Sequence, residues 1–310
     1  MNPDVFLEQK EVPFLIKALT RWSQQVIIAS DRQDVLNNSG IHQALLNQIK
    51  FDNKAPLFVN SLVAELKKYS FSYKKPDYHP LVNLLQHLCD RAESEIDEFP
   101  EEDLALFGKL LEEGKDKLKA LASRHAVGRI ESPKGTGIGT GVLIQPDLLL
   151  TCHHVFTKSQ VKEAWVRFNY KSGSLPLDQY LFELDLAFVS YHSNRPDHAL
   201  VRVKGQPQQL TANRINDMLD SGQEIRTLHH PLGKPVEISQ IGHIVHPDED
   251  YINHNLRTDN GSSGAPIFNR QWELIAIHQG DTGISRTLPP GIMGGIPIRA
   301  IWDTISPHLA

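Results

Sequence analysis

The sequence is poor in cysteine, in long apolar runs and in net charge. Its two cysteines, Cys89 and Cys152, are too few in 310 residues for a disulfide framework and are typical of a reducing compartment. No window approaches the run of about eighteen apolar residues that a membrane-spanning helix needs. The first residues lack the basic flank and apolar core of a signal peptide. A formal charge of −5 and a pI near 6.3 do not favour nucleic acid or membrane binding. We therefore expect a cytoplasmic protein.

Motifs for metal and nucleotide chemistry are also missing. Neither Cys-x-x-Cys nor His-Glu-x-x-His occurs, and no glycine-rich phosphate loop follows a predicted strand. His243 and His246 are three residues apart, so their side chains would face opposite sides of a strand. We expect neither a cofactor nor a metal site.

The first third of the chain has helical periodicity. Pro13 can open a helix, Ser30 or Asp31 can cap a short second helix, and Gly40 can end it. Residues 101–121 have acids first and lysines late, as the helix dipole favours. Apolar residues at i, i+3, i+4 and i+7 indicate two further helices: Val59, Leu62, Val63 and Leu66, then Leu81, Leu84, Leu85 and Leu88. We predict a helical bundle over residues 1–120.

After residue 125 the pattern changes to short apolar runs separated by glycine and proline. Ten such runs are typical of strands, and together they predict an all-β barrel or sandwich over residues 121–310. The predicted strands are 126–131, 141–145, 148–151, 164–168, 200–203, 225–228, 241–245, 265–268, 274–277 and 295–297.

Three reactive side chains lie at strand ends of this β region, in the order histidine, aspartate, serine. An apolar strand ends in His153 and His154, Asp197 leads into a strand, and Ser263 lies in a glycine-rich turn. A histidine can act as general base for a serine hydroxyl, and a carboxylate can orient that histidine. Residues 258–268 alone could equally be a surface turn. The ordered set favours a serine nucleophile.

Residues 124–306 resemble the chymotrypsin-fold serine proteases, in particular the bacterial trypsin-like and glutamyl-endopeptidase branch. The resemblance implies a double β-barrel with its active site in the cleft between the barrels. The motifs that carry it are Gly137–Ile144 (GIGTGVLI), Leu150–Val155 (LTCHHV), Asp197–Val201 (DHALV), His230–Gly233 (HPLG), Gly261–Pro266 (GSSGAP) and Ile275–His278 (IAIH).

The resemblance implies a role for each member of the set. His154 matches the family histidine because the pattern is Thr-x-x-His-Val, which leaves His153 as a structural or exposed residue. Asp197 matches the family aspartate. Its gap from His154 (197 − 154 = 43) leaves more room for barrel strands than that of the competing Asp185 (185 − 154 = 31).

The serine turn supplies the nucleophile and the oxyanion donors of this resemblance. Ser263 matches the nucleophile, and the N–H groups of Gly261 and Ser263 match the oxyanion hole, because glycine lets the backbone turn tightly. Cys152 lies in the histidine strand and is interpreted as a small buried residue. Ser262 stands where secreted members that mature by cleavage carry aspartate, which leaves control to the helical domain as a hypothesis.

Two positions match the specificity pocket of glutamyl endopeptidases. Thr258 and His278 correspond to the threonine and histidine of that pocket, and Arg257 stands where enzymes selective for Lys or Arg carry aspartate. The resemblance implies cleavage after Glu or Gln. The alternative is that His278 only packs beneath the barrel.

Residues 51–90 resemble the effector-associated, death-fold-like adaptors of prokaryotic conflict systems. This resemblance implies homotypic binding to a matching adaptor on a sensor or ATPase, and the alternative is a helical cap that only packs on the second domain.

Two histidines of this region are interpreted as structural. His79 is expected in a solvated turn and His87 on a helix surface, and neither is expected to be a ligand. The sequence thus predicts a serine endopeptidase with an adaptor domain, and the adaptor resemblance implies a role as a defence effector. The alternatives are a non-catalytic scaffold and a quality-control protease.

Overall fold

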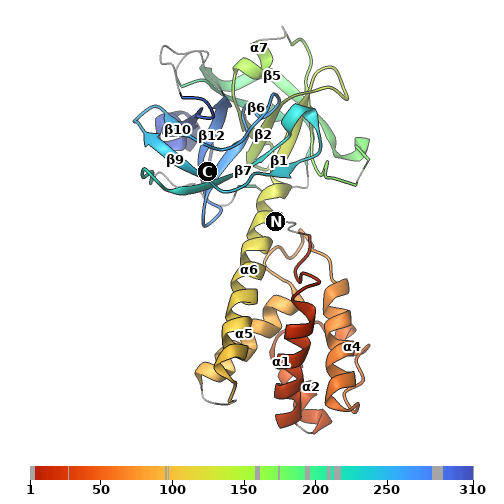
Figure 1. The fold of residues 1–310 in the computed structure, drawn as a ribbon. Coiled ribbons are helices and arrows are strands. Elements are labelled where there is room, and N and C mark those ends of the chain that lie inside the picture. The colour runs from red at the N-terminus through yellow and green to blue at the C-terminus, as the bar shows by residue number, and fades with distance from the viewer. Residues whose placement is uncertain are drawn as a thin grey trace. The chain divides into compact units, whose positions relative to one another are not determined.

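The chain divides into two compact units, Met1–Leu121 and Ala122–Ala310 (Figure 1). The computed structural model describes residues 4–26, 28–94, 96, 98–157, 161–173, 175–192, 196–207, 211–212, 218–280 and 289–309. Within these residues, no helix is long and apolar enough to cross a membrane.

The first unit is a helical bundle. The helices are α1 (Val12–Gln25), α2 (Ala29–Asn38), α3 (Gln43–Leu46), α4 (Ala55–Lys68), α5 (Pro80–Glu93) and α6 (Glu101–His125). Proline lies in the first turn of α1, α4 and α5, where its missing N–H has no intrahelical partner to lose. The apolar residues of α4 and α5 that recur at helical spacing all face one core, together with Trp22, Phe58 and Phe107.

Two expectations for this unit are wrong. Helix α2 begins at Ala29 with the extended residue Ile28 as its N-cap, so Ser30 and Asp31 lie inside the first turn and do not cap it. His79 is not solvated: it is 1% exposed and its Nδ1 accepts a hydrogen bond from the Leu81 N–H at 3.2 Å. Its side chain therefore caps α5, and burial lowers its pKa to about 4. His87 is half-buried on α5.

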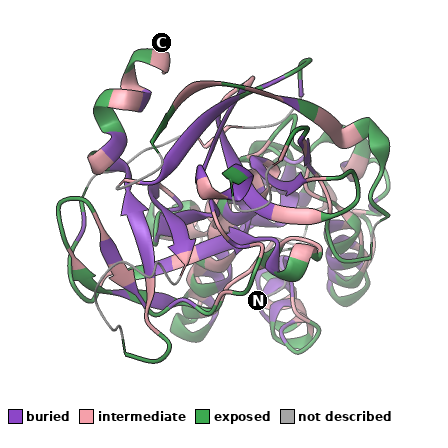
Figure 2. Ribbon diagram, turned by 90° about the horizontal axis from the view of Figure 1, so that it is seen from above, coloured by how far each residue is buried: buried purple, intermediate pink, exposed green. Residues whose placement is uncertain are grey.

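The first barrel of the second unit closes in the order β1-β2-β3-β6-β5-β4. Its strands are β1 (Val127–Glu131), β2 (Gly137–Gln145), β3 (Leu148–Thr151), β4 (Trp165–Arg167), β5 (Leu181–His192) and β6 (His198–Val203). The twelve residues of β5 were not predicted as a strand. The barrel strands β1, β2, β3 and β6 are buried along most of their length. Figure 2 shows the buried strands of the chain in purple.

The second barrel is a sheet in the order β11-β12-β13-β10-β9-β7-β8, and a further pairing of β11 with β7 closes six of these strands into a ring. Its strands are β7 (Glu224–His229), β8 (Glu237–Ile238), β9 (Gly242–Pro247), β10 (Ile252–His254), β11 (Pro266–Asn269), β12 (Leu274–Gly280) and β13 (Met293–Pro297). The predicted fold class, a helical bundle followed by a double β-barrel, is confirmed.

Candidate active site

Strand pairing brings the histidine and the aspartate together. Strands β3 and β6 are antiparallel, with Thr151 opposite Ala199, so the residues that follow β3 lie beside those that precede β6. His154 begins the short helix α7 (His154–Thr157) and its Nδ1 hydrogen-bonds to Oδ2 of Asp197. The backbone N–H of His154 donates to Oδ1 of the same carboxylate at 3.1 Å. Two contacts therefore fix the imidazole against Asp197.

The other ring nitrogen of this histidine is available. Nε2 of His154 is buried and has no hydrogen-bond partner among the described residues. Because Nδ1 faces a carboxylate, it holds the ring hydrogen and leaves Nε2 as a lone-pair acceptor. His154 is thus oriented to accept a proton at Nε2.

A further residue contacts the aspartate and has no counterpart among the sequence predictions. Nε2 of Gln279, on β12, donates to Oδ2 of Asp197 at 3.4 Å. Both side chains are buried, at 8% and 4% exposed. The only sequence signal is that Gln279 follows His278 in the Ile-Ala-Ile-His motif.

The serine turn requires both of its glycines. Gly261 has φ of +91° and Gly264 has φ of +82°, the left-handed region that disfavours other residues. A Cβ at Gly264 would lie 2.0 Å from Oγ1 of Thr151, and one at Gly261 would lie 2.7 Å from the His230 carbonyl oxygen. The turn around Ser263 therefore packs directly against the neighbouring backbone.

Thr140 of β2 links this turn to the first barrel. Its Oγ1 donates to the Gly261 carbonyl at 2.8 Å, and its N–H donates to the Ser263 carbonyl at 2.9 Å. The amide N–H groups of Gly261 and Ser263, in contrast, donate to no other group in the described part of the chain. The turn thus has its carbonyls bound and these two donors free.

A cavity of about 390 Å³ brings the candidate residues together. Its walls come from β2, from α7, from the loop after β7 and from the serine turn. The lining residues are Gly137, Ile138, His154, Val155, Leu232, Asn260, Gly261 and Ser263. His154, Ser263 and both candidate oxyanion residues therefore share one cavity.

The competing residues lie elsewhere. His153 is 7% exposed and its ring stacks on Tyr191 at a centroid distance of 4.5 Å, and burial lowers its pKa. Asp185 lies in β5, where its Oδ1 accepts a hydrogen bond from the Ala187 N–H at 3.0 Å. Neither bonds to His154 among the described residues.

One possible metal-ligand group coincides with the pair just described. Ligand atoms of Cys152, His154 and Asp197 lie within 4.8 Å of one another. Nδ1 of His154 and the Asp197 carboxylate already bond to each other, and the Cys152 Sγ–H donates to the His278 carbonyl at 3.5 Å. Nδ1 of His154, the Asp197 carboxylate and the Cys152 thiol are therefore already engaged in hydrogen bonds.

The predicted pocket residues Thr258 and His278 do not line this cavity and do not hydrogen-bond to each other in the described residues. Thr258 is half-buried and His278 is 2% exposed. Burial, with smaller contributions from neighbouring histidines, holds the pKa of His278 well below its ordinary value. His278 is therefore neutral at neutral pH.

A second buried histidine, His254 on β10, sets the hydrogen position on His278. The Leu256 N–H donates to Nδ1 of His254 at 3.2 Å, so the ring hydrogen of His254 is on Nε2. That atom lies 3.2 Å from Nδ1 of His278, and burial lowers the pKa of His254 to about 4. With its Nδ1 accepting, neutral His278 carries its own hydrogen on Nε2.

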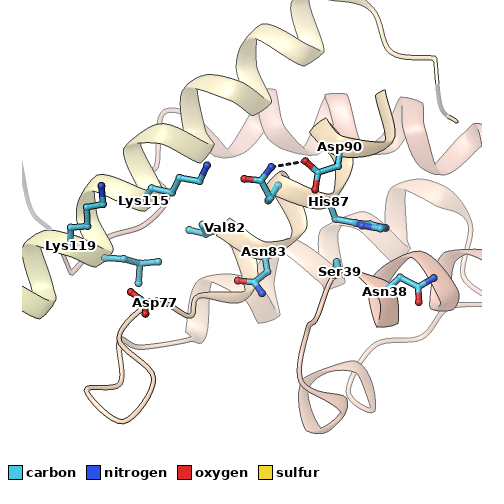
Figure 3. Close-up of a pocket in the computed structure, with 11 residues that line it drawn as sticks. Asn38, Ser39, Asp77, Val82, Asn83, His87, Asp90, Lys115 and Lys119 are labelled. Carbon is cyan, nitrogen blue, oxygen red and sulfur yellow. Dashed lines mark hydrogen bonds between the residues drawn. The ribbon is translucent and has the colours of Figure 1, made fainter. Parts of the chain in front are cut away.

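The helical unit has a groove of about 360 Å³ between α2, α5 and α6 (Figure 3). Lys115 and Lys119 of α6 lie on one side of it, and Asp90 accepts a hydrogen bond from Gln86 at 2.6 Å on α5. The remaining lining residues are Asn38, Ser39, Asp77, Val82, Asn83, His87 and Leu118. The lining of this groove is mostly polar, with Val82 and Leu118 as its apolar members.

Comparison with protein families matches both units. Residues 139–277 match the trypsin-like peptidase domain, and residues 9–125 match effector-associated domain 8. The chain joins an effector-associated domain to a trypsin-like peptidase domain. Both resemblances seen in the sequence are thereby confirmed.

Curated relatives of the peptidase domain include glutamyl endopeptidases of Staphylococcus aureus. That of strain MW2 is 30% identical over 165 residues, which cover 49% of this chain and 49% of the relative. That of strain MRSA252 is 29% identical over 165 residues and is covered to 45%. The chain spans about half the length of the curated relatives it matches.

Solved structures similar to this chain include the serine endoprotease from Yersinia pestis, with a TM-score of 0.48 and 19% identity over 62% of this chain and 65% of that chain. The inactive form of the Rv3671c protease, from M. tuberculosis H37Rv, has a TM-score of 0.47 and 18% identity, covering 62% of this chain and 93% of that chain.

Proposed function

We propose that this protein is a serine endopeptidase with His154, Asp197 and Ser263 as its catalytic residues. The observation that carries the proposal is that two hydrogen bonds join His154 to Asp197, while His154 lines the same cavity as Ser263. The match to the trypsin-like peptidase domain supports the same conclusion. A non-catalytic scaffold has no use for a carboxylate-oriented histidine whose Nε2 has no partner among the described residues, in a cavity that a serine also lines.

The first half of the reaction forms an acyl-enzyme. The Ser263 hydroxyl attacks the scissile carbonyl while its proton passes to Nε2 of His154. Asp197 stabilises the imidazolium through Nδ1. His154 then returns the proton to the leaving amine, and a water molecule hydrolyses the ester by the same route.

The tetrahedral intermediate needs donors for its oxyanion, and we assign the backbone N–H groups of Gly261 and Ser263 to this task. Both groups are without an acceptor among the described residues, and both residues line the cavity. A donor that is already in place requires no reorganisation during the reaction.

Cleavage after Glu or Gln is the specificity that we propose, with Thr258 and His278 as the pocket residues. The ring hydrogen on Nε2 of neutral His278 can donate to a carboxylate or to an amide oxygen, but would not attract a cationic side chain. The name of the curated relatives, glutamyl endopeptidase, supports the same class.

Labelling with a fluorophosphonate tests the catalytic assignment. The wild-type chain should react covalently at Ser263, and Ser263→Ala should not react. The Ser262→Ala variant, which keeps the nucleophile, should still be labelled. Labelling that persists in Ser263→Ala, or wild-type protein that neither reacts nor cleaves any peptide of a library, would contradict the proposal.

The helical unit, we propose, binds a protein partner and controls or recruits the peptidase, as the match to effector-associated domain 8 supports. A chain that begins at residue 122 should differ from the full chain in activity or in its dependence on such a partner. Identical, partner-independent activity of both chains would refute control by this unit. A cytoplasmic location and a role as a defence effector remain proposals.

A further inference from the structure

The side chain of Ser262, next to the nucleophile, points away from solvent. It is 0% exposed, and its Oγ lies 2.7 Å from Nδ1 of His229. The Asp259 N–H donates to the same Oγ at 3.3 Å, and the Ser262 N–H donates back to the Asp259 carbonyl at 3.0 Å. The buried Ser262 hydroxyl thus connects Asp259, at the start of the turn, to His229.

His229 ends strand β7 and is held by the second barrel. It pairs with Glu237 of β8, and two residues earlier Thr227 pairs with Ile267 of β11. It is 4% exposed, and burial lowers its pKa to about 4, so its ring is neutral at neutral pH. Neutral Nδ1 can accept the Ser262 hydroxyl hydrogen while Oγ accepts the Asp259 N–H.

The turn needs such an anchor because its conformation is not set by local preference. Gly261, with φ of +91°, has access to more backbone conformations than any other residue type. Rotation about Ser262 would turn the peptide groups on both of its sides, and with them the Ser263 N–H. Within the turn, Thr140 bonds to the carbonyls of Gly261 and Ser263, and the Leu232 N–H donates to the Asn260 carbonyl at 2.5 Å. Among the described residues, Ser262 is the turn residue whose side chain bonds to strand β7.

We propose that the buried Ser262–His229 hydrogen bond is a positioning device that holds residues 259–263 with the Gly261 and Ser263 amides directed into the catalytic cavity. The inference rests on the proposed peptidase function. Neither Ser262 nor His229 lines the catalytic cavity. They act through the oxyanion donors, and the anchor lies wholly within the second unit.

Steady-state kinetics on a peptide with Glu before the scissile bond test the proposal. Ser262→Ala and His229→Leu should each lower kcat by about tenfold to a hundredfold, less than the roughly hundred- to thousandfold loss of a complete oxyanion donor. KM should change by less than about twofold, because the donors act mainly on the transition state. The double variant should be no worse than either single variant, since both remove one hydrogen bond.

Two further variants separate positioning from general destabilisation. His229→Asn places an amide oxygen near the position of Nδ1, where it can accept the Ser262 hydroxyl hydrogen. It should therefore recover most of the kcat that His229→Leu loses. Thr227→Val removes another buried hydroxyl of β7, which donates to the Pro266 carbonyl at 2.7 Å, and should leave kcat unchanged. Thermal unfolding of every variant shows whether it is folded at the assay temperature.

The outcomes distinguish this inference from the proposed function. Wild-type activity that depends on Ser263, with unchanged kcat in Ser262→Ala, overturns the anchor alone. Equal losses in Thr227→Val and Ser262→Ala, or additive losses in the double variant, overturn it too. Absence of Ser263-dependent activity in the wild type would instead contradict the proposed function.

Discussion

In the helical unit the buried carboxylate of Asp103 faces an arginine, and in the barrel unit the buried carboxylate of Asp197 faces a histidine. Asp103 is 2% exposed and accepts a hydrogen bond from Nε of Arg21 at 2.8 Å. Asp197 is 4% exposed and bonds to Nδ1 of His154. Arginine is charged at all relevant pH values, whereas histidine can exchange a proton. The first pair can only stabilise, and the second can also perform acid–base chemistry.

The same contrast extends to the other histidines. Among the described residues, the helical unit buries His79 beside a helix start, while the barrel unit buries several histidines. The barrel set is His153, His198, His229, His230, His254 and His278. Burial lowers the pKa of each, so each stays neutral and can donate with one nitrogen and accept with the other. Burial in the barrels thus keeps these rings neutral, and all of them except His153 have a hydrogen bond at Nδ1 among the described residues.

Replacing the two aspartates is expected to separate the units most clearly. Asp197→Asn keeps the shape of the side chain but no longer favours the Nδ1–H tautomer of His154, so kcat should fall by about 10⁴-fold. Asp103→Asn should lower the thermal midpoint of the helical unit and leave kcat within about twofold. Peptidase kinetics and calorimetry on both variants measure these effects. Comparable activity in both would show that Asp197 is structural.

Buried charge in the barrel should matter more for stability than its counterpart in the bundle. Glu131 is 0% exposed and bonds to Arg129, to Arg167 and to the Gly135 N–H. Glu131→Gln removes the carboxylate that two buried guanidinium groups share and leaves Arg167 only one carboxylate among the described residues, that of the exposed Asp178 at 3.4 Å, which should cost about 3–5 kcal/mol. Glu11 forms its ion pair with the exposed Lys109 and accepts a hydrogen bond from the Glu8 N–H at 3.3 Å, so Glu11→Gln should lower the free energy of unfolding by about 1 kcal/mol or less. Urea denaturation checks both values.

The pH dependence of this ion cluster follows from its hydrogen bonds. Burial alone would raise the pKa of Glu131, but hydrogen bonds from Arg167, Gly135 and Arg129 lower it below its ordinary 4.5. A lowered carboxyl pKa stabilises the fold above the ordinary value, and this stability is lost as the pH falls through the folded pKa. Acid denaturation curves of wild type and Glu131→Gln should therefore converge below about pH 4.5. Curves that stay parallel down to low pH would show that the ionised Glu131 carboxylate is not the source of this stability.

The pocket histidine offers a smaller effect, on specificity. His278→Phe keeps a ring of similar size but removes the Nε2 donor, so kcat/KM for a substrate cleaved after Glu should fall about 100-fold. Labelling of Ser263 by a small fluorophosphonate should continue at the wild-type rate, since that reagent does not fill the pocket. An unchanged preference for Glu would show that His278 only packs beneath the barrel.

Periodicity and turn residues predicted most elements because each depends on a few neighbouring side chains. The exceptions have physical reasons. Strand β5 (Leu181–His192) has mostly half-buried residues on both faces and a bulge between Asp185 and Ser190, so its pattern does not alternate. Strand β10 has three residues, too few for a pattern. Ile28 caps α2 through its extended backbone, which side-chain preferences for caps do not reveal.

For the candidate site, the sequence supplied His154, Asp197 and Ser263, because each lies in a short motif. It did not supply the contacts that orient them. Gln279 and Asp197 are 82 residues apart, and Thr140 and Gly261 are 121 apart. The Glu131 cluster likewise depends on the register that places Arg129 opposite Arg167. Such contacts follow from strand pairing, which no local pattern encodes.

The smallest expected effect concerns His79, the buried histidine of the bundle. His79→Ala removes the side chain that caps α5 and should cost about 1 kcal/mol, measured as faster hydrogen exchange of the α5 amides at pH 7. The folded pKa of about 4 lies below the ordinary 6.5, so the stability that wild type owes to neutral His79 is present above pH 6.5 and is lost as the pH falls towards 4. His79→Asn keeps a capping oxygen but cannot titrate. The α5 amides of this variant should be as protected from exchange as those of wild type at pH 7, and better protected at pH 5. If the variant instead loses protection in parallel with wild type as the pH falls, His79, unlike the histidines of the barrels, is not held neutral by burial.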